Sequence, residues 1–129
     1  MLLKDYIPDI DKKIFFSGIC FDSSKIKKNN IFFAIKGNNI DGNRFISGAI
    51  KKGAKIIITE KKIKKIPDGI QFIQVKNIRK LLAQVSFKIQ KNIPKNLIAV
   101  TGTNGKSSIA DFYFQILKLN NKNVASIGT

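Results

Sequence analysis

A glycine-rich loop between an apolar run and a helical pattern constrains the fold more than any other feature of this 129-residue chain. The loop, Val100-Thr-Gly-Thr-Asn-Gly-Lys-Ser-Ser108, follows the apolar run 97–100. After it, apolar side chains recur at the three-to-four spacing of an amphipathic helix; they are Ile109, Phe112, Tyr113, Ile116 and Leu117. We therefore expect a strand over 97–100, a helix from Ser107 onward, and the loop at the turn between them. This is an α/β arrangement.

The composition of this loop predicts that it binds the phosphates of a nucleoside triphosphate. The first N–H groups of a helix have no partner and the helix end carries about half a positive charge, so phosphate oxygens bind there. Lys106 is expected to reach the terminal phosphates and the Ser107 hydroxyl to ligate Mg²⁺, while two glycines allow close approach of the backbone. The expected nucleotide-binding residues are Gly102, Thr103, Asn104, Gly105, Lys106, Ser107 and Ser108. The alternative interpretation is a glycine-rich turn with a solvated lysine, since Val100 stands where the usual Walker pattern has a glycine.

Strand and helix patterns also alternate through the residues before this loop. Apolar or alternating runs predict strands at 14–21, 31–35, 54–59 and 71–75, and a further one near the end at 123–127. Helical spacing predicts a helix over 44–52, ended by Gly53, and a second helix capped by Asn77. The apolar face of that second helix consists of Ile78, Leu81, Leu82, Val85 and Ile89. Turn-forming residues separate these elements at 22–24, 37–42 and 67–69.

This alternation predicts a small α/β domain over residues 1–92 and the opening of a second α/β domain over residues 93–129. The segment 92–96, with Pro94 inside it, is expected to link them. The second region holds only a strand, the loop, a helix and a strand, whereas a parallel sheet needs several strands with both faces covered. We therefore expect the chain to be cut short within its second domain.

The net charge of +16 raises the alternative of a nucleic-acid-binding module. Nearly all of the positive charge is lysine, with Arg44 and Arg79 as the only arginines, whereas base recognition relies on arginine. Lysine, asparagine and isoleucine are all frequent and have codons rich in A and T, so we attribute the charge to an AT-rich genome. No nucleic-acid partner is expected, and steeply salt-dependent DNA binding would favour the alternative.

Other features of the composition exclude several kinds of site. The single cysteine, Cys20, excludes an internal disulfide and a Cys-x-x-Cys metal site, and its apolar surroundings predict a small buried side chain. The absence of histidine excludes His general-base chemistry from this segment. No apolar run approaches the roughly twenty residues that span a bilayer, and the N-terminus lacks the layout of a signal peptide. We expect a cytoplasmic protein with no membrane partner.

The loop Thr101-Gly-Thr-Asn-Gly-Lys-Ser107 resembles that of the Mur ligases and of the related folylpolyglutamate synthetases, whose own loop lies near the N-terminus. Upstream, the stretches 22–25, 30–37, 41–45 and 49–55 resemble the N-terminal uridine-nucleotide-binding domain that two Mur ligases share. One of these enzymes adds the third residue of the peptidoglycan stem peptide, and the other adds the terminal dipeptide. The Thr-Asn-Gly-Lys form of the loop and the closing stretch 126–129 favour the first. Two positions depart from the pattern: Ser107-Ser108 replaces the usual Thr-Thr, and Asn43 replaces a frequent histidine.

The resemblance implies a cytoplasmic, ATP-dependent ligase of peptidoglycan synthesis. Such an enzyme joins meso-diaminopimelate or L-lysine to UDP-N-acetylmuramoyl-L-alanyl-D-glutamate through an acyl-phosphate intermediate, and Lys106 with Mg²⁺ would stabilise the charge of the transferred phosphoryl group. Residues 1–92 would bind the UDP-sugar substrate and residues 93–129 would begin the ATP-binding domain, so this chain alone is expected to be inactive. The alternatives are the ligase that adds the terminal dipeptide and a non-catalytic UDP-sugar-binding module.

The resemblance also implies which residues contact the UDP-sugar portion of the substrate. They are Phe21 and Ser23, after the first predicted strand, and Asn38, Asn39 and Ile40, in the loop after Gly37. Hydroxyl, amide and backbone groups on tight loops suit the recognition of uracil and diphosphate. The alternative interpretation is ordinary turn chemistry, because Asp-Ser-Ser and Asn-Asn favour turns whatever their function.

Overall fold

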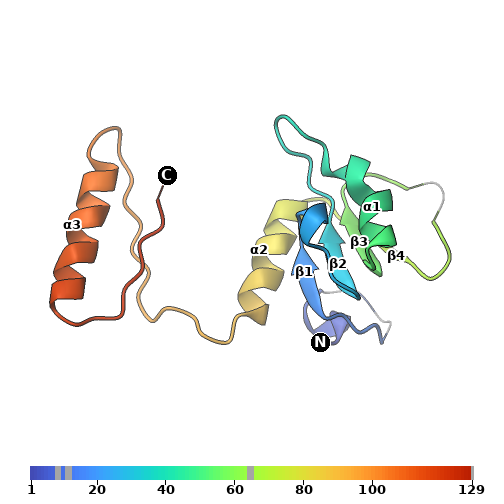
Figure 1. The fold of residues 1–129 in the computed structure, drawn as a ribbon, viewed down its shortest axis with the longest axis horizontal. Coiled ribbons are helices and arrows are strands. Elements are labelled where there is room, and N and C mark those ends of the chain that lie inside the picture. Colours follow the sequence, from blue (N-terminus) through green and yellow to red (C-terminus); the bar gives the residue numbers. More distant parts are fainter. Residues whose placement is uncertain (8–9, 11–12, 64–65, 129) are drawn as a thin grey trace. The chain divides into compact units, whose positions relative to one another are not determined.

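The computed structural model of the chain describes residues 1–7, 10, 13–63 and 66–128, which divide into two compact units, Met1–Ile93 and Pro94–Thr129 (Figure 1). The strands described in the first unit are β1 (Gly18–Cys20), β2 (Asn30–Phe33), β3 (Ile56–Thr59) and β4 (Gln71–Gln74). Its α-helices are α1 (Ile46–Lys51) and α2 (Ile78–Ile89), and its 3-10 helices are η1 (Leu3–Asp5), η2 (Ser23–Lys25) and η3 (Gly42–Phe45). The second unit contains α3 (Lys106–Leu119).

The strands of the first unit form one parallel sheet in the order β1-β2-β3-β4. Each strand pairs with the one before it, for example at Ile31 with Ile56 and at Ile56 with Gln71. Every residue of the two central strands is buried, as expected for parallel strands that are covered on both faces. Because the strands are parallel, the loops that follow all of them leave from one edge of the sheet, which we call the carboxyl edge.

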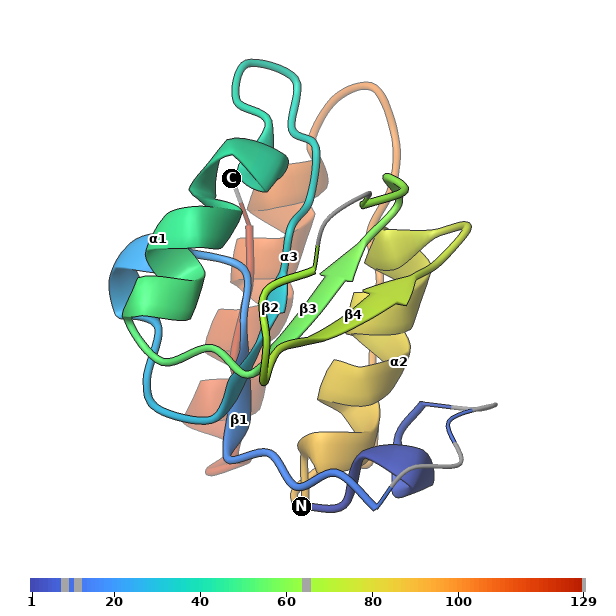
Figure 2. The same cartoon turned by 90° about the vertical axis from the view of Figure 1, so that its right-hand side faces the viewer.

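The sheet is the middle of three layers, with α1 on one face and α2 on the other (Figure 2). Alternate residues of β2 and β3 point to opposite faces. Ile31, Phe33 and their β3 neighbours pack with Leu81 and Val85 of α2. On the other face, Phe32 and Ile57 pack with Ala49 of α1. The predicted α/β domain is confirmed for this part of the chain.

Most predicted elements of the first unit are present with small shifts at their ends. The Asn77 side chain caps α2 by accepting a 2.9 Å hydrogen bond from the Lys80 N–H. The helix predicted over 44–52 is divided into η3 and α1, and Gly53 follows it with a positive φ of 104°. A side chain there would be strained and would lie 3.1 Å from the Lys28 Cα, so glycine suits this helix end.

The strand predicted over 14–21 is wrong over much of its length, because its first part pairs with the N-terminus and not with the sheet. The Leu3 N–H donates to the Ile14 carbonyl at 2.8 Å, and Leu2 and Phe15 form an isolated antiparallel bridge. Only Gly18–Cys20 joins β2. Cys20, which we expected to be buried, is half-buried, and its thiol donates to the Asp22 carbonyl at 3.0 Å.

In the second unit, the predicted helix is confirmed as α3, but the strands predicted over 97–100 and 123–127 are absent. A strand exists only where backbone groups bond to a neighbouring strand. In the part of the chain that the structure describes, neither segment has backbone hydrogen bonds of that kind. No residue of α3 is buried, and its apolar face, including Phe112 and Ile116, is exposed. Across the described residues, every helix is too short or too polar to span a bilayer.

Candidate functional site

The predicted phosphate loop forms one exposed turn that leads directly into α3. Gly102 and Gly105 have positive φ angles of 151° and 76°. Gly105 is the residue immediately before α3, and Lys106 is the first helical residue. L side chains rarely adopt these backbone angles, so the positions of the two glycines are set by the conformation of the turn. Residues 101–109 are all exposed.

The first turn of α3 presents unpaired N–H groups beside this loop. The first hydrogen bond of the helix runs from the Ile109 N–H to the Gly105 carbonyl at 2.9 Å. The N–H groups of Lys106, Ser107 and Ser108 precede it, so the helix itself offers them no acceptor. Together with the positive end of the helix dipole, this arrangement fits an anion such as a phosphate. Ser107 is exposed in the same turn. Its hydroxyl group is suited to ligate a Mg²⁺ ion that also binds phosphate oxygens.

The Lys106 side chain folds back over the loop. Its ammonium group donates to the Gly102 carbonyl at 2.5 Å and to the Thr103 carbonyl at 3.2 Å. Both acceptors belong to the turn and the side chain remains exposed. The positive charge therefore lies over the same turn as the unpaired N–H groups, where it can meet a bound anion.

The predicted uridine-nucleotide residues lie in the other unit, after the first two strands of the sheet. Phe21 follows β1 and its side chain is 68% exposed. Ser23 begins η2, and its carbonyl accepts a 3.0 Å hydrogen bond from the Lys52 ammonium group. Asp22 caps η2 by accepting hydrogen bonds from the Ser24 hydroxyl and N–H, which lower the pKa of this carboxyl below its ordinary value of 3.8. The end of β1 thus carries an exposed ring beside a short, capped turn.

Asn38, Asn39 and Ile40 form the exposed tip of a hairpin-like loop after β2. The loop is closed by an isolated bridge between Lys36 and Asp41, and the Gly37 N–H donates to the Ile40 carbonyl at 2.8 Å. We call residues 36–41 the tip loop. No hydrogen bond among the described residues joins its tip to Phe21 or Ser23. The parallel strands nevertheless direct both groups toward the carboxyl edge.

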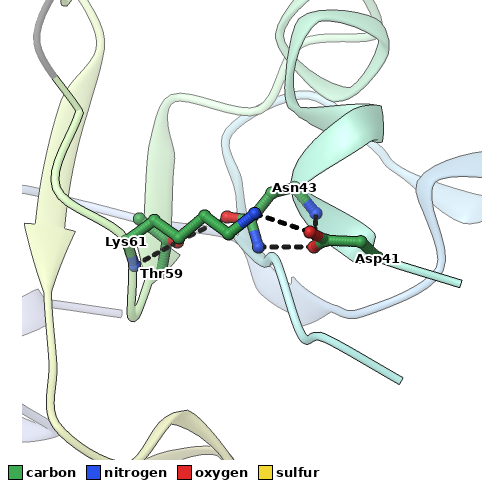
Figure 3. A network of polar contacts seen from close by, with 4 residues as sticks. All are labelled: Asp41, Asn43, Thr59 and Lys61. Carbon is green, nitrogen blue, oxygen red and sulfur yellow. Dashed lines mark hydrogen bonds and ion pairs between the residues drawn. The ribbon is translucent and has the colours of Figure 1, made fainter. Parts of the chain in front are cut away.

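Sequence reasoning missed a polar network at the base of the tip loop, formed by Asp41, Asn43, Thr59 and Lys61 (Figure 3). One carboxylate oxygen of Asp41 accepts from the Asn43 N–H at 3.0 Å and from the Asn43 side-chain amide at 2.7 Å. The other oxygen lies 2.6 Å from the Lys61 ammonium nitrogen. The Thr59 hydroxyl donates to the Asn43 amide oxygen at 2.5 Å and accepts from the Lys61 N–H at 3.0 Å.

This network fixes the charge of Asp41. The hydrogen bond from Lys61, followed by those from Asn43, holds the pKa of this carboxyl far below its ordinary value. An Asp-Gly-Asn sequence indicates a local turn, which could have pointed to the contact between Asp41 and Asn43. No local signal points to Lys61, which is 20 residues away from Asp41 in the sequence.

Beside this network, the carboxyl edge has an open hollow lined by Glu60, Gln74, Val75 and Lys76. Glu60 accepts a 2.9 Å hydrogen bond from the Ile78 N–H, so its carboxylate is a second acceptor at the start of α2. The described residues include no cluster of three or more His, Cys, Asp or Glu side chains that could hold a metal ion.

Comparisons with known proteins relate the chain to one family. Residues 15–88 match a family model described as the Mur ligase family, catalytic domain. The UDP-N-acetylmuramoyl-L-alanyl-D-glutamate--2,6-diaminopimelate ligase of Rickettsia montanensis is 45% identical over 112 residues, which cover 87% of this chain and 23% of the relative. The ligase of the same name from Alkaliphilus metalliredigens is 37% identical over 138 residues, which cover 100% of this chain and 28% of the relative. The chain thus spans about a quarter of the length of these relatives.

Solved structures are similar as well. MurF ligase from Thermotoga maritima in complex with ADP has a TM-score of 0.63 at 27% identity, covering 84% of this chain and 25% of that chain. Crystal structure I of MurF from Acinetobacter baumannii has a TM-score of 0.59 at 26% identity, covering 91% of this chain and 24% of that chain.

Proposed function

The chain belongs to the Mur ligase family, and we propose that it is the N-terminal part of a MurE-type ligase of peptidoglycan synthesis. Such an enzyme adds the third amino acid of the stem peptide to UDP-N-acetylmuramoyl-L-alanyl-D-glutamate. The two curated relatives described above carry this substrate in their names, and both are named for 2,6-diaminopimelate, which favours that amino acid over L-lysine. Their identity of 37–45%, against 26–27% for the MurF structures, favours the MurE type over the MurF type.

The geometry at the start of α3 is the single observation that carries the catalytic part of this proposal. Two glycines with positive φ precede a helix whose first residue is Lys106, and the N–H groups of that first turn have no helical acceptor. The resemblance of the fold to a MurF ligase solved with ADP supports a nucleotide as the ligand. In the proposal, residues 102–108 bind the phosphates of ATP and Ser107 holds Mg²⁺.

The N-terminal unit supplies the second binding site of the proposal. Residues 1–92 would bind the UDP-sugar substrate, with contacts at Phe21, Ser23 and the tip of the tip loop, Asn38–Ile40. These side chains are accessible at the carboxyl edge of a parallel sheet, which is where open α/β sheets bind ligands. Residues 93–129 would begin the ATP-binding domain.

The residues of the chain would contribute to the reaction mainly by positioning and by charge. ATP supplies the phosphoryl group that activates the substrate carboxylate for attack by the amine. Lys106 and the N–H groups at the start of α3 would stabilise the negative charge of the phosphates. Neither task needs histidine, which the chain lacks. In the proposal the two binding tasks belong to different units, because the phosphate loop lies in Pro94–Thr129 and the uridine residues lie in Met1–Ile93.

Titration calorimetry with the 129-residue chain tests the substrate site. UDP-N-acetylmuramoyl-L-alanyl-D-glutamate is expected to bind saturably, and Asn39→Ala is expected to weaken this binding. Asn96→Ala is the matched control, because Asn96 is also exposed but lies outside the proposed site. Absence of binding at millimolar substrate would contradict the proposal.

A single substitution separates the two halves of the function. In a full-length ligase that contains this chain, Lys106→Ala is expected to abolish ligation and to leave binding of the UDP-sugar substrate intact, because the lysine belongs to the phosphate loop alone. Ligation that survives in this variant would contradict the role of the loop.

The gene gives an independent test: a reading frame that continues far beyond codon 129 is expected for the ligase, and a stop codon there would favour a non-catalytic binding module.

A further inference from the structure

We propose that Asp41 and Lys61 act together as positioning residues for the UDP-sugar substrate, by holding the tip loop in the conformation that binds it. This inference rests on the proposed function, which places Asn38, Asn39 and Ile40 against the substrate. It adds two residues that contact no substrate themselves. They act through the base of the tip loop.

The tip loop has little support of its own. Its tip residues are exposed, and apart from the bond from the Gly37 N–H to the Ile40 carbonyl, the described hydrogen bonds that shape it lie at its base. The Gly42 N–H donates to the Ile35 carbonyl at 2.9 Å, and a side chain at Gly42 would collide with that carbonyl oxygen. The guanidinium group of Arg79, in α2, donates a 3.2 Å hydrogen bond to the Lys36 carbonyl. The conformation of the tip is therefore set by what fixes residues 36 to 42.

Asp41 connects this base to the neighbouring strand. One of its carboxylate oxygens accepts hydrogen bonds from both the backbone N–H and the side-chain amide of Asn43, which lies in η3 just before α1. Its other oxygen binds the ammonium group of Lys61 at 2.6 Å. Lys61 lies just after β3, and its backbone N–H donates a hydrogen bond to the hydroxyl of the buried Thr59. Four residues thus join the loop after β2 to the segment after β3 (Figure 3).

The ion pair is too exposed to matter much for the stability of the whole unit. The Lys61 side chain is 56% exposed and that of Asp41 is 24% exposed, and exposed pairs contribute little to global stability. Its removal should instead loosen the tip loop. A loop that must be ordered during binding lowers affinity, because the ordering entropy opposes association. We therefore expect an effect on substrate affinity without a matching effect on unfolding.

Calorimetric titration of the 129-residue chain with UDP-N-acetylmuramoyl-L-alanyl-D-glutamate tests the inference. Lys61→Met is expected to raise the Kd roughly 3- to 10-fold, whereas the urea unfolding midpoint stays at the wild-type value. Lys61→Arg, which keeps the charge, is expected to restore most of the affinity. Lys62→Met is the matched control at the next lysine, which is also exposed, and should bind as the wild type does.

A double-mutant cycle tests the pair itself. Asp41→Asn keeps an oxygen that can accept from Asn43 but removes the charge that faces Lys61. If the two residues act as one unit, Asp41→Asn combined with Lys61→Met weakens binding no more than the stronger single variant does. Additive losses would overturn the coupling between them.

The remaining outcomes separate this inference from the proposed function. A wild-type chain that binds the substrate, with Lys61→Met binding equally well, overturns the positioning role and leaves the proposed function standing. A Kd that rises only in proportion to a lower urea midpoint also overturns it, because the role is then merely structural. A wild-type chain that fails to bind overturns the proposed function and this inference with it.

Discussion

Asp41 illustrates how one side chain can hold several contacts when its charge is fixed. Its pKa is lowered first by the hydrogen bond from Lys61 and then by those from Asn43. By linkage, a carboxyl group with a lowered pKa stabilises the folded protein at pH values above the ordinary value of 3.8, and this contribution is lost as the pH falls through the folded pKa. For an ion pair as exposed as this one the contribution to global stability is small. The network at the base of the tip loop should therefore stay intact throughout the neutral and mildly acidic range.

An NMR titration of the Asp41 carboxyl carbon checks this expectation. In the wild-type chain the group should remain charged at pH 3.8, where an ordinary aspartate is half protonated. In Lys61→Met the titration midpoint should rise toward that ordinary value, because the main cause of the lowered pKa is gone. Asp22, whose hydrogen-bond partner is Ser24, provides the internal control and should titrate alike in both proteins. Identical midpoints for Asp41 in the two proteins would contradict the assigned cause.

At this scale, sequence reasoning reached local features and missed distant ones. The loop glycines were identifiable because their spacing before Lys106 is a local pattern, and both adopt positive φ in the structure. Thr59 and Lys61 were not identifiable as partners of the tip loop. They are 16 and 20 residues from the groups they bind, and only the parallel pairing of β2 with β3 brings them together. The roles of the candidate binding residues stay predictions.

Among the elements, α2 offers a clean test of local stabilisation. Asn77 accepts from the Lys80 N–H at the start of this helix, and an N-cap of this kind contributes about 1 kcal/mol. Asn77→Ala should lower the free energy of unfolding by about that amount, measured by urea denaturation. Asn96→Ala, at an exposed position without regular structure, should change it by less than about 0.5 kcal/mol. Equal effects of both substitutions would contradict the capping role.

Elements were predicted correctly where an apolar sequence pattern also has a neighbouring element to pack against or to pair with. The apolar run around Ile58 and the helical face around Val85 pack in the same core cluster, and both elements are present. The apolar run 97–100 and the partly apolar run 123–127 form no strand. An apolar run favours a strand only when a neighbouring strand can bond to it, and sequence alone does not supply that neighbour. The N-terminal strand was too long for a related reason, since Phe15 pairs with Leu2.

For the whole molecule, burial predicts that the two units differ in local stability. All residues of β3 are buried, whereas no residue of α3 is. Amide hydrogens resist exchange where opening would expose a packed core. Hydrogen-exchange mass spectrometry should therefore show slow exchange over Ile56–Thr59 and fast exchange over Lys106–Leu119 in the same sample. Comparable protection of the two segments would contradict this difference.

The order of the strands has a consequence for how the first unit forms. Each strand of the sheet pairs with its predecessor in the sequence, so every new pairing closes a short stretch of chain. Short closures carry a small entropic penalty and favour rapid folding. During synthesis, each strand leaves the ribosome after the strand that it pairs with has already emerged. The sheet can thus grow in the direction of translation, and its core can be complete before the phosphate loop is made.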